Sequence, residues 1–260
     1  MTVHSAQPDA RAALVTGAGR GIGRATALAL ASAGARVFGV SRTTAELASL
    51  AAEGPIDVYA ASLADMAGCR EVATEAVERL GKVDILVHCA GVDTHRERAI
   101  WQQDADVWRD TMAVNADAAF ELTRLLAGGM VDRGWGRIVM VSSTAGSVGG
   151  PASSAYCAAK HAVVGLMRAV AQDVAPHGVT CNAVLPGWVR GTGMSDRTMA
   201  LAAEREGISV EEVWAKIEAD SVAGRVVDPG EVADAIAYLT SENSGAINGE
   251  AIRIALGELW

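Results

Sequence analysis

The sequence predicts an α/β fold: one doubly wound, seven-stranded parallel sheet with helices on both faces. A length of 260 residues fits a single domain of this kind. Short β-type runs alternate with Ala-rich helical stretches, which is the pattern of βαβ units around a parallel sheet. Half of the residues are hydrophobic but only 4% are aromatic, so small side chains allow close packing of helices on the sheet.

The predicted strands are seven short runs rich in apolar and β-branched residues. They cover residues 12–16, 35–40, 56–60, 83–88, 136–141, 179–184 and 250–255. The predicted helices lie between them, near 22–33, 44–53, 66–80, 105–131, 154–175 and 229–240. Each helix is long enough for a right-handed crossover between parallel strands, which favours the doubly wound topology.

The domain organisation is simple. Residues 1–10 form a polar tail and residues 11–260 form one domain. The segment 190–225 interrupts the alternation, because it contains no strand and has the pattern of two charged amphipathic helices around Gly207. We expect the part from Gly191 to Gly224, inserted after the sixth strand, to be a lid over the substrate.

Charge and hydropathy exclude several classes of function. The formal net charge is −9 and Lys and Arg are scattered, so nucleic acid is not an expected partner. No apolar run approaches the roughly 18 to 20 residues that span a bilayer, and the N-terminus lacks the apolar centre of a signal peptide, so we expect a cytoplasmic protein. The four cysteines show neither a CxxC pair nor zinc-ligand spacing with histidines, so we expect no metal site and no disulfide.

A glycine-rich turn joins the first strand to the first helix. It reads Thr16-Gly-Ala-Gly-Arg-Gly-Ile-Gly23. Glycines let the backbone turn sharply and approach a pyrophosphate, whose charge the helix N-terminus favours. The turn therefore predicts a Rossmann-type dinucleotide site that uses Gly17, Gly19, Arg20, Gly21, Ile22 and Gly23.

A tyrosine and a lysine four residues apart begin the helix predicted near 154–175. This spacing places the Tyr156 phenol and the Lys160 ammonium on one helix face, where the cation favours the phenolate and lowers the pKa of the phenol. Taken alone, such a tyrosine–lysine pair is usually part of an ordinary helix surface. Ser143, thirteen residues earlier, ends a predicted strand, and open sheets bind ligands at the carboxyl ends of their strands.

The order TGxxxGxG, Ser and YxxxK resembles the short-chain dehydrogenase/reductase family over nearly the whole chain. Asp84, Asn115 and the pair Pro186-Gly187 agree with that resemblance. The resemblance implies hydride transfer between a nicotinamide cofactor and a carbonyl or alcohol. It also implies a homotetramer, with which the apolar helix at 154–175 and the terminal Leu259-Trp260 agree.

The resemblance also implies a role for each catalytic residue. Tyr156 would donate and accept the proton at the substrate oxygen, and Ser143 would hydrogen-bond that oxygen. Lys160 would bind the nicotinamide ribose and tune Tyr156, while Asn115 would fix the backbone and a water that links Lys160 to solvent.

Further cofactor contacts follow from the same resemblance, with some departures. The usual NNAG after the fourth strand is replaced by His88-Cys-Ala-Gly, and we interpret His88 as structural. The usual Asp at the adenine is replaced by Ser62, and the spacing after Pro186 is one residue shorter than usual. The cofactor contacts expected here are Ser62, Leu63, Cys89, Ala90, Gly91, Pro186, Gly187, Val189 and Thr192, with Tyr156 and Lys160.

The cofactor is predicted to be NADP(H). Relatives that prefer NAD carry an acidic residue at the end of the second strand, whereas this chain has Ser41-Arg42. Arg42 and Arg20 are expected to hold a 2′-phosphate, and no carboxylate is expected there to repel it.

The substrate is predicted to be a small apolar ketone or its secondary alcohol. The expected lining beside Ser143 and Tyr156 is small or apolar, with Ala145, Val148 and Trp188. A 3-oxoacyl or polyketide ketoreductase acting on a carrier-bound substrate is the alternative. A nucleotide-sensing protein without catalysis is a third hypothesis, which the presence of both Tyr156 and Lys160 disfavours.

Overall fold

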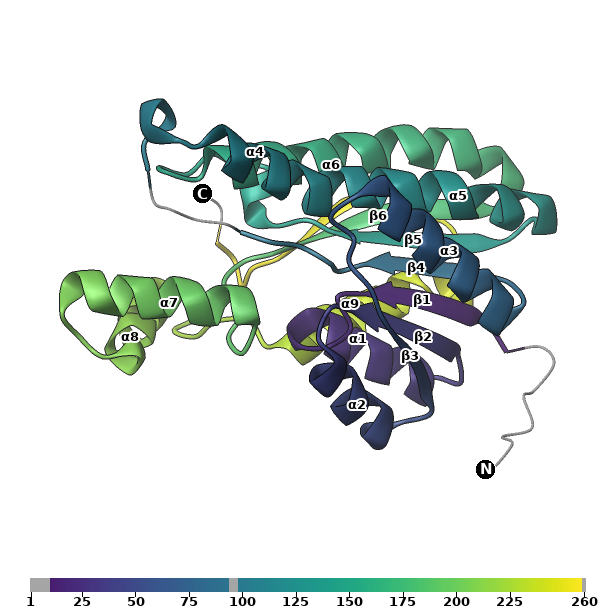
Figure 1. Ribbon diagram of the computed structural model, residues 1–260, viewed down its shortest axis with the longest axis horizontal. Helices are drawn as coiled ribbons and strands as arrows, with labels where there is room; N and C mark the ends of the chain where they lie inside the picture. Colours follow the sequence, from purple (N-terminus) through teal and green to yellow (C-terminus); the bar gives the residue numbers. More distant parts are fainter. Residues whose placement is uncertain (1–9, 94–97, 259–260) are drawn as a thin grey trace.

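A computed structural model describes residues 10–93 and 98–258 of the chain. It contains one parallel sheet of seven strands in the order β3-β2-β1-β4-β5-β6-β7, which confirms the predicted fold class (Figure 1). The strands are β1 (Ala12–Thr16), β2 (Arg36–Ser41), β3 (Ile56–Ala60), β4 (Ile85–His88), β5 (Gly136–Val141), β6 (Val179–Pro186) and β7 (Ala251–Ile254). Residues 1–9 of the predicted tail and the terminal Leu259-Trp260 lie outside the described residues.

The strand order places the switch point of the sheet beside β1. The chain adds β2 and β3 on one side of β1 and then returns to add β4 on the other, so β1 pairs with both β2 and β4. The crossover after β1 runs to one side of the sheet and the crossover after β4 runs to the other, which opens a crevice at the carboxyl ends of β1 and β4. Any ligand of this sheet is therefore expected above Thr16 and His88, where β1 and β4 end.

Helices cover both faces of the sheet (Figure 1). On one face lie α1 (Gly21–Ser32), α2 (Thr44–Glu53) and α9 (Pro229–Leu239). On the other lie α3 (Met66–Leu80), α5 (Ala118–Arg133) and α6 (Ser154–Val174). Alternate residues of β1 serve the two cores, because Leu14 packs with α3, α5 and α6 while Val15 packs with α1 and α9.

The single helix predicted at 105–131 is interrupted. Helix α4 (Ala105–Met112) and helix α5 are joined by a π-helical turn, Ala113–Asp117, whose centre is Asn115. A π-turn adds a residue to one helical turn and is frequent at functional sites. The sequence pattern missed it because the residues around Asn115 continue the helical pattern without a break.

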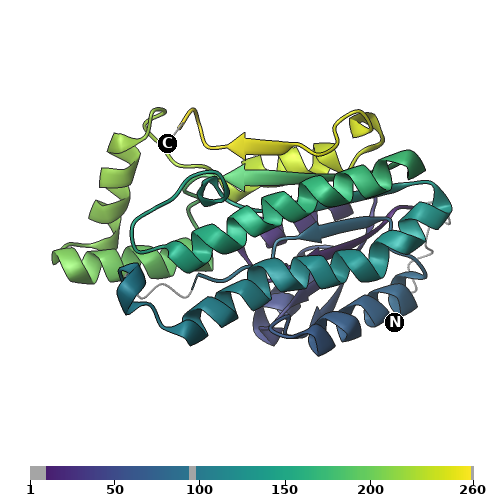
Figure 2. The same ribbon diagram turned by 90° about the horizontal axis from the view of Figure 1, so that it is seen from above.

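The segment after β6 forms the two predicted helices, α7 (Gly193–Glu206) and α8 (Val210–Asp220). Gly207 ends α7 in the left-handed conformation, with φ of 69°, so the chain turns there as expected. The two helices bury a small core of their own, formed by Met199, Ala202, Ala203, Val213 and Trp214. They project beyond one end of the sheet (Figures 1 and 2).

Two further findings concern expectations from composition. No helix among the described residues is long and apolar enough to cross a membrane. All four cysteines are free thiols.

Candidate active site

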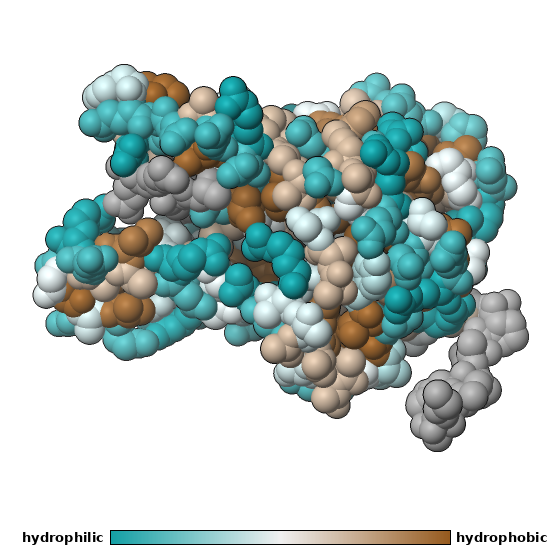
Figure 3. Space-filling view, in the orientation of Figure 1, coloured by the Kyte–Doolittle hydropathy of each residue, from teal (hydrophilic) through white to brown (hydrophobic). Residues whose placement is uncertain are grey.

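A cavity of about 460 Å³ opens at the carboxyl edge of the sheet, where β1 and β4 end. Figure 3 shows the molecule hollowed between the α7–α8 end and the body. The structure brings together every predicted site residue except Asn115. The cavity is lined by Gly17, Gly19, Arg20, Gly21, Ile22, Gly23, Ser41, Arg42, Ser62, Leu63, Cys89, Ala90, Gly91, Ser143, Ala145, Val148, Tyr156, Lys160, Pro186, Gly187, Trp188, Val189 and Thr192.

The glycine-rich loop forms one end of the cavity and requires its glycines. Gly17 has a φ of 67°, and a Cβ there would lie 2.9 Å from the Ala90 nitrogen. A Cβ on Gly23 would overlap the Gly17 carbonyl oxygen. The loop therefore lies directly against the strand end that carries Ala90, and the N-terminus of α1 faces the cavity. This cradle fits the pyrophosphate of a dinucleotide.

His88 ties β4 to β1, which agrees with its predicted structural role. The Thr16 hydroxyl accepts a hydrogen bond from the Ala90 backbone nitrogen at 3.0 Å and lies 3.2 Å from His88 Nδ1. Burial, and secondarily the charge of Lys160, lower the pKa of His88 to about 3. Although this chain has His88 at the start of the segment that reads NNAG in the family, a contact between β1 and β4 is kept, and a neutral imidazole makes it.

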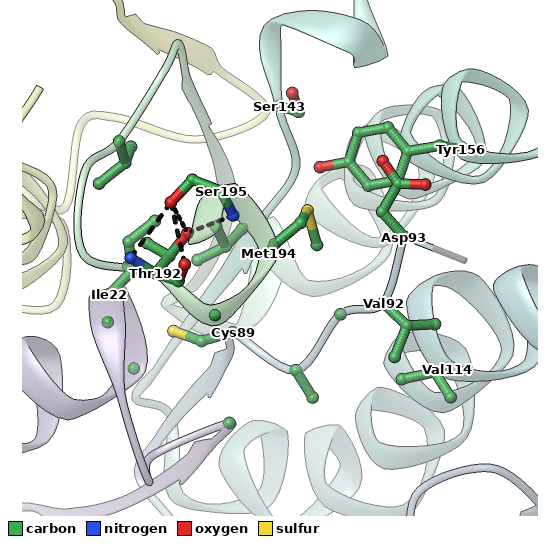
Figure 4. A pocket seen from close by; sticks show the side chains of 18 of the residues that line it. Ile22, Cys89, Val92, Asp93, Val114, Ser143, Tyr156, Thr192, Met194 and Ser195 are labelled. Carbon is green, nitrogen blue, oxygen red and sulfur yellow. Dashed lines mark hydrogen bonds between the residues drawn. The ribbon is translucent and has the colours of Figure 1, made fainter. Parts of the chain in front are cut away.

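Lys160 fixes the start of α6 to the end of β5. Its Nζ donates a hydrogen bond to the Val141 carbonyl at 3.0 Å, and its own carbonyl accepts one from the Ser142 hydroxyl at 2.9 Å. The ammonium lies 5.6 Å from the centre of the Tyr156 ring. Ser143, the next residue after Ser142, faces the same space as Tyr156 (Figure 4).

Burial controls the protonation of both groups. It raises the pKa of Tyr156 above its usual value of 10.0, the Ser143 hydroxyl opposes that shift by hydrogen bonding, and the charge of Asp93 adds to it. Burial lowers the pKa of Lys160 to about 8. The predicted lowering of the phenol pKa by Lys160 is therefore wrong for this structure, in which burial is the largest influence on the phenol and raises its pKa. Tyr156 is a neutral phenol at pH 7, with a proton to donate.

Asn115 lies behind the cavity and not in its wall. Its Nδ2 donates hydrogen bonds to the Val92 carbonyl at 2.7 Å and to the Thr111 carbonyl at 2.8 Å. Its buried Oδ1 has no hydrogen bond within the described part of the chain. A Cβ built on Gly91 would lie 2.9 Å from this oxygen and 3.3 Å from Lys160 Nζ, so both atoms lie close to one point beside Gly91. Asn115 is thus placed to position the strand end and the lysine.

The end of the cavity near β2 holds an acidic residue that the sequence analysis missed. Glu46 lines the cavity, and its carboxylate lies 3.6 Å from the Arg20 guanidinium. A Cβ on Gly19 would lie 2.7 Å from both Glu46 Oε2 and the Ser41 hydroxyl. The prediction that no carboxylate lies here is wrong, because it considered only the end of β2 and not the first turn of α2. Arg42 is exposed beside this pair.

The other end of the cavity surrounds Tyr156 and is less apolar than predicted. Met194 reaches it from α7 (Figure 4). Trp188 lines it as well and packs edge-on against Trp214, with ring centres 6.5 Å apart. Asp93 and Arg197 also line the cavity, although nothing in the sequence pattern singled them out. The one signal in the sequence that points to Asp93 is its place two residues after Gly91, a predicted cofactor contact.

Comparisons with known proteins agree with this geometry. The family model "short chain dehydrogenase" matches residues 11–202. The chain is 36% identical to a 2-keto-3-deoxy-L-fuconate dehydrogenase of Xanthomonas campestris, over 91% of this chain and 76% of that protein. It is 37% identical to a putative ketoacyl reductase of granaticin synthesis in Streptomyces violaceoruber, over 94% and 92%. A crystal structure of a single-substitution variant of actinorhodin polyketide ketoreductase with NADPH superposes with a TM-score of 0.91 at 33% identity, covering 98% of this chain and 100% of that one.

His88 is expected to make stability depend on pH. The unfolded chain takes up a proton at this residue near pH 6.5, whereas the folded chain resists it down to about pH 3, so stability is lost as the pH falls below 6.5. Between pH 7 and pH 5 this amounts to about 2 kcal/mol of unfolding free energy. Urea denaturation at the two pH values should therefore show a smaller loss for His88→Asn than for the wild type.

The exposed His177, in the turn after α6, provides the matched control. His177→Asn should keep the wild-type loss between the two pH values. Equal losses for the wild type and His88→Asn would contradict the assignment of a buried, neutral His88.

Proposed function

The chain belongs to the short-chain dehydrogenase family, and from that premise we propose that it transfers a hydride between NADP(H) and a small ketone or secondary alcohol. One observation carries the proposal: Ser143, Tyr156 and Lys160 line the same cavity as the glycine-rich loop. The proton-transfer groups therefore open onto the space where a dinucleotide would lie. We further propose that the enzyme is cytoplasmic.

The residues of the site have separate roles in the reduction. The bound cofactor supplies the hydride, and the side chains donate a proton and hydrogen bonds to the oxygen of the substrate. The neutral Tyr156 donates its proton to the carbonyl oxygen as the alcohol forms, and the Ser143 hydroxyl donates a hydrogen bond to the same oxygen. Lys160, held by Val141, places a positive charge beside the phenol as negative charge develops.

Selection of NADP(H) is proposed to depend on Arg42 and Arg20. Both line the cavity at its β2 end, and a guanidinium holds a phosphate by charge-assisted hydrogen bonds. The Arg20–Glu46 pair at 3.6 Å is partly exposed, and such pairs contribute little stability, so a 2′-phosphate can compete for Arg20. If Glu46 instead accepts hydrogen bonds from the ribose hydroxyls, the preference turns to NAD(H).

The segment from Gly191 to Gly224 is proposed to be the substrate lid. A Cβ on Gly193 would overlap the Arg20 guanidinium, and one on Gly21 would lie 3.1 Å from the Thr192 methyl. The start of α7 therefore rests on the glycine-rich loop and covers the cavity. Gly191 and Gly224, both with positive φ, are the proposed hinges.

A carrier-bound 3-oxoacyl group remains the alternative substrate. The ketoacyl reductases among the relatives favour it, and so does a second hollow of about 620 Å³ that shares Ser153, Trp188 and Thr198 with the first cavity. Faster reduction of a 3-oxoacyl thioester than of its free ketone analogue would favour this alternative.

Tyr156→Phe should slow reduction by on the order of 10² to 10⁴, because the ring still packs but the proton donor is lost. The kcat for NADPH-dependent reduction of a ketone at pH 7 is the measurement. Tyr59→Phe is the matched control, since that phenol bonds Glu71 at the exposed edge of the sheet and should leave kcat unchanged. A Tyr156→Phe enzyme with the wild-type kcat would refute the catalytic role.

Arg42→Ala should weaken NADPH binding by roughly 1.5 to 3 kcal/mol and NADH binding little, because only NADPH carries the 2′-phosphate. Titration of each cofactor tests this. Glu46→Gln should tighten NADPH binding by releasing Arg20 and removing a negative charge. Equal losses for both cofactors in Arg42→Ala would remove Arg42 from the 2′-phosphate site. A Glu46→Gln variant that binds only NADH more weakly would reassign this end to NAD(H).

Hydrogen exchange should detect the lid. Protection of residues 193–220 should rise on addition of NADP⁺ and an unreactive substrate analogue by more than protection of β6 and α9. Protection without ligand equal to that of α6 would show that the segment is fixed.

We also propose that the enzyme is a homotetramer. Large apolar side chains on and before α4 and on α5 are exposed, with Trp101 at 83%, Trp108 at 45% and Phe120 at 46%. Light scattering should give a mass of four times 26.8 kDa at micromolar concentration. A mass near 26.8 kDa would count against the tetramer, and Phe120→Glu should lower the mass if this face pairs.

A further inference from the structure

The guanidinium of Arg20 lies directly against the start of α7, so one side chain belongs to both the proposed cofactor site and the proposed lid. Gly193 is the first residue of α7 and is buried. A Cβ built on Gly193 would overlap the Cζ, Nη1 and Nε atoms of Arg20, so the guanidinium occupies the space that a side chain would need. The glycine that begins α7 is therefore matched to the arginine of the glycine-rich loop.

A second contact joins the same two segments. A Cβ on Gly21 would lie 3.1 Å from the methyl group of Thr192, the residue that caps α7. The Thr192 hydroxyl accepts a hydrogen bond from the Ser195 backbone nitrogen at 3.2 Å, which holds the first turn of the helix together. Figure 4 shows Thr192 and Ser195 beside Ile22, the residue after Gly21. The first turn of α7 is thus one capped unit that rests on the loop, and Arg20 supports it from the side.

Arg20 is weakly held on its other side. Its Nη1 lies 3.6 Å from Glu46 Oε1, and the two side chains are 49% and 30% exposed. Ion pairs of this kind contribute little stability. The guanidinium also lies beside the N-terminus of α7, where the helix dipole disfavours a positive charge. A stronger anion at the β2 end of the cavity can therefore draw the guanidinium away from Gly193.

The 2′-phosphate of NADP(H) is such an anion, because it carries a charge of about −1.5 to −2 at pH 7, whereas NAD(H) has a neutral hydroxyl at the same place. The Ser41 hydroxyl and Glu46 Oε2 would each lie 2.7 Å from a Cβ built on Gly19, so both reach the loop beside Arg20. A phosphate bound at this end takes the place of Glu46 as the partner of Arg20 through charge-assisted hydrogen bonds.

We propose that Arg20 makes the lid respond to the cofactor. Without a 2′-phosphate, its guanidinium holds the first turn of α7 on the glycine-rich loop. A bound 2′-phosphate withdraws the guanidinium and releases that turn, so that α7 can close over the substrate. The inference rests on the proposed function, since it places a nicotinamide cofactor in this cavity. It makes Arg20 a positioning residue through which NADP(H) and NAD(H) differ at the lid as well as in affinity.

Hydrogen exchange with the oxidised cofactors alone tests the proposal, and it needs no turnover. The wild-type protein is saturated with NADP⁺ or with NAD⁺, and exchange is compared in the first two turns of α7. The cofactor covers α7 equally in both complexes, so the difference reports the 2′-phosphate. Exchange should be at least about fivefold faster with NADP⁺, the lower end of the usual coupling between two sites.

Gly193→Ala separates the release of α7 from the binding of the phosphate. The added methyl group displaces the flexible end of Arg20 but leaves its charge in the cavity. Exchange in α7 with NAD⁺ should therefore rise to the wild-type level with NADP⁺. Because the two effects are linked, NADP⁺ should bind this variant more tightly by the same factor, and the affinity for NAD⁺ should not change. Arg20→Ala should also lose the difference in exchange, but it should bind NADP⁺ more weakly.

Arg190→Ala provides the matched control. Arg190 pairs with Glu211 and Glu218 of α8 and lies outside the cavity lining, so this change removes a guanidinium that holds the lid at its other helix. Exchange in the lid should rise equally with both cofactors, and the ratio between NADP⁺ and NAD⁺ in α7 should stay that of the wild type.

The outcomes separate this inference from the proposed function. Equal exchange in α7 for wild-type protein saturated with NADP⁺ and with NAD⁺ would overturn the role of Arg20 at the lid and leave the proposed function intact. Weaker binding of NADP⁺ by Gly193→Ala would also overturn it, because Arg20 would then bind the phosphate from its place against Gly193. A protein that binds neither cofactor would overturn the proposed function together with this inference.

Discussion

The site depends on the hydrogen bonds that hold the buried ammonium of Lys160. Lys160 is 4% exposed, and a charge removed from water is tolerated only when hydrogen bonds replace its hydration. The Val141 carbonyl supplies one such bond at the end of β5. The return bond from Ser142 to the Lys160 carbonyl leaves no room for a side chain at Gly146, where a Cβ would lie 2.8 Å from that carbonyl oxygen. Helix α6 is thereby fixed to β5, so Tyr156 and Ser143 have defined positions.

Desolvation makes burial of the Lys160 ammonium unfavourable, and it also determines the protonation state of the neighbouring Tyr156. Burial keeps the Tyr156 phenol neutral and lowers the pKa of Lys160 to about 8, so both groups differ from their behaviour in water. Asp93 acts against the shift at Lys160 and with the shift at Tyr156, because a negative charge favours both protonated forms. The site without ligand is therefore in the protonation state that reduction of a carbonyl requires.

The fold could be predicted from the sequence because its signals are local and repeated. Each strand is a short apolar run and each crossover is a helical stretch, so most errors were confined to a residue or two at the ends of elements. The glycine loop, Ser143, Tyr156 and Lys160 were predictable because fixed spacings on known elements bring them to one edge. Glu46 and Asp93 were missed because their importance depends on where α2 and the chain after β4 approach the cavity, which is a tertiary property. The π-helical turn at Asn115 was missed because it changes hydrogen bonding without changing the hydrophobic pattern.

Two classes of function share most of this architecture, since a nucleotide-sensing protein needs the cradle of Gly17, Gly21 and Ala90 but not the proton donor. The central claim is that this chain passes a hydride from the cofactor to a carbonyl. It is tested most directly with NADPH deuterated at the transferable position of C4, followed by mass spectrometry of the product. The account predicts that the secondary alcohol carries one deuterium on its carbinol carbon, with one NADP⁺ formed per alcohol. Tight binding of NADPH without its consumption, and without deuterium in any alcohol across a panel of ketones, would contradict the account.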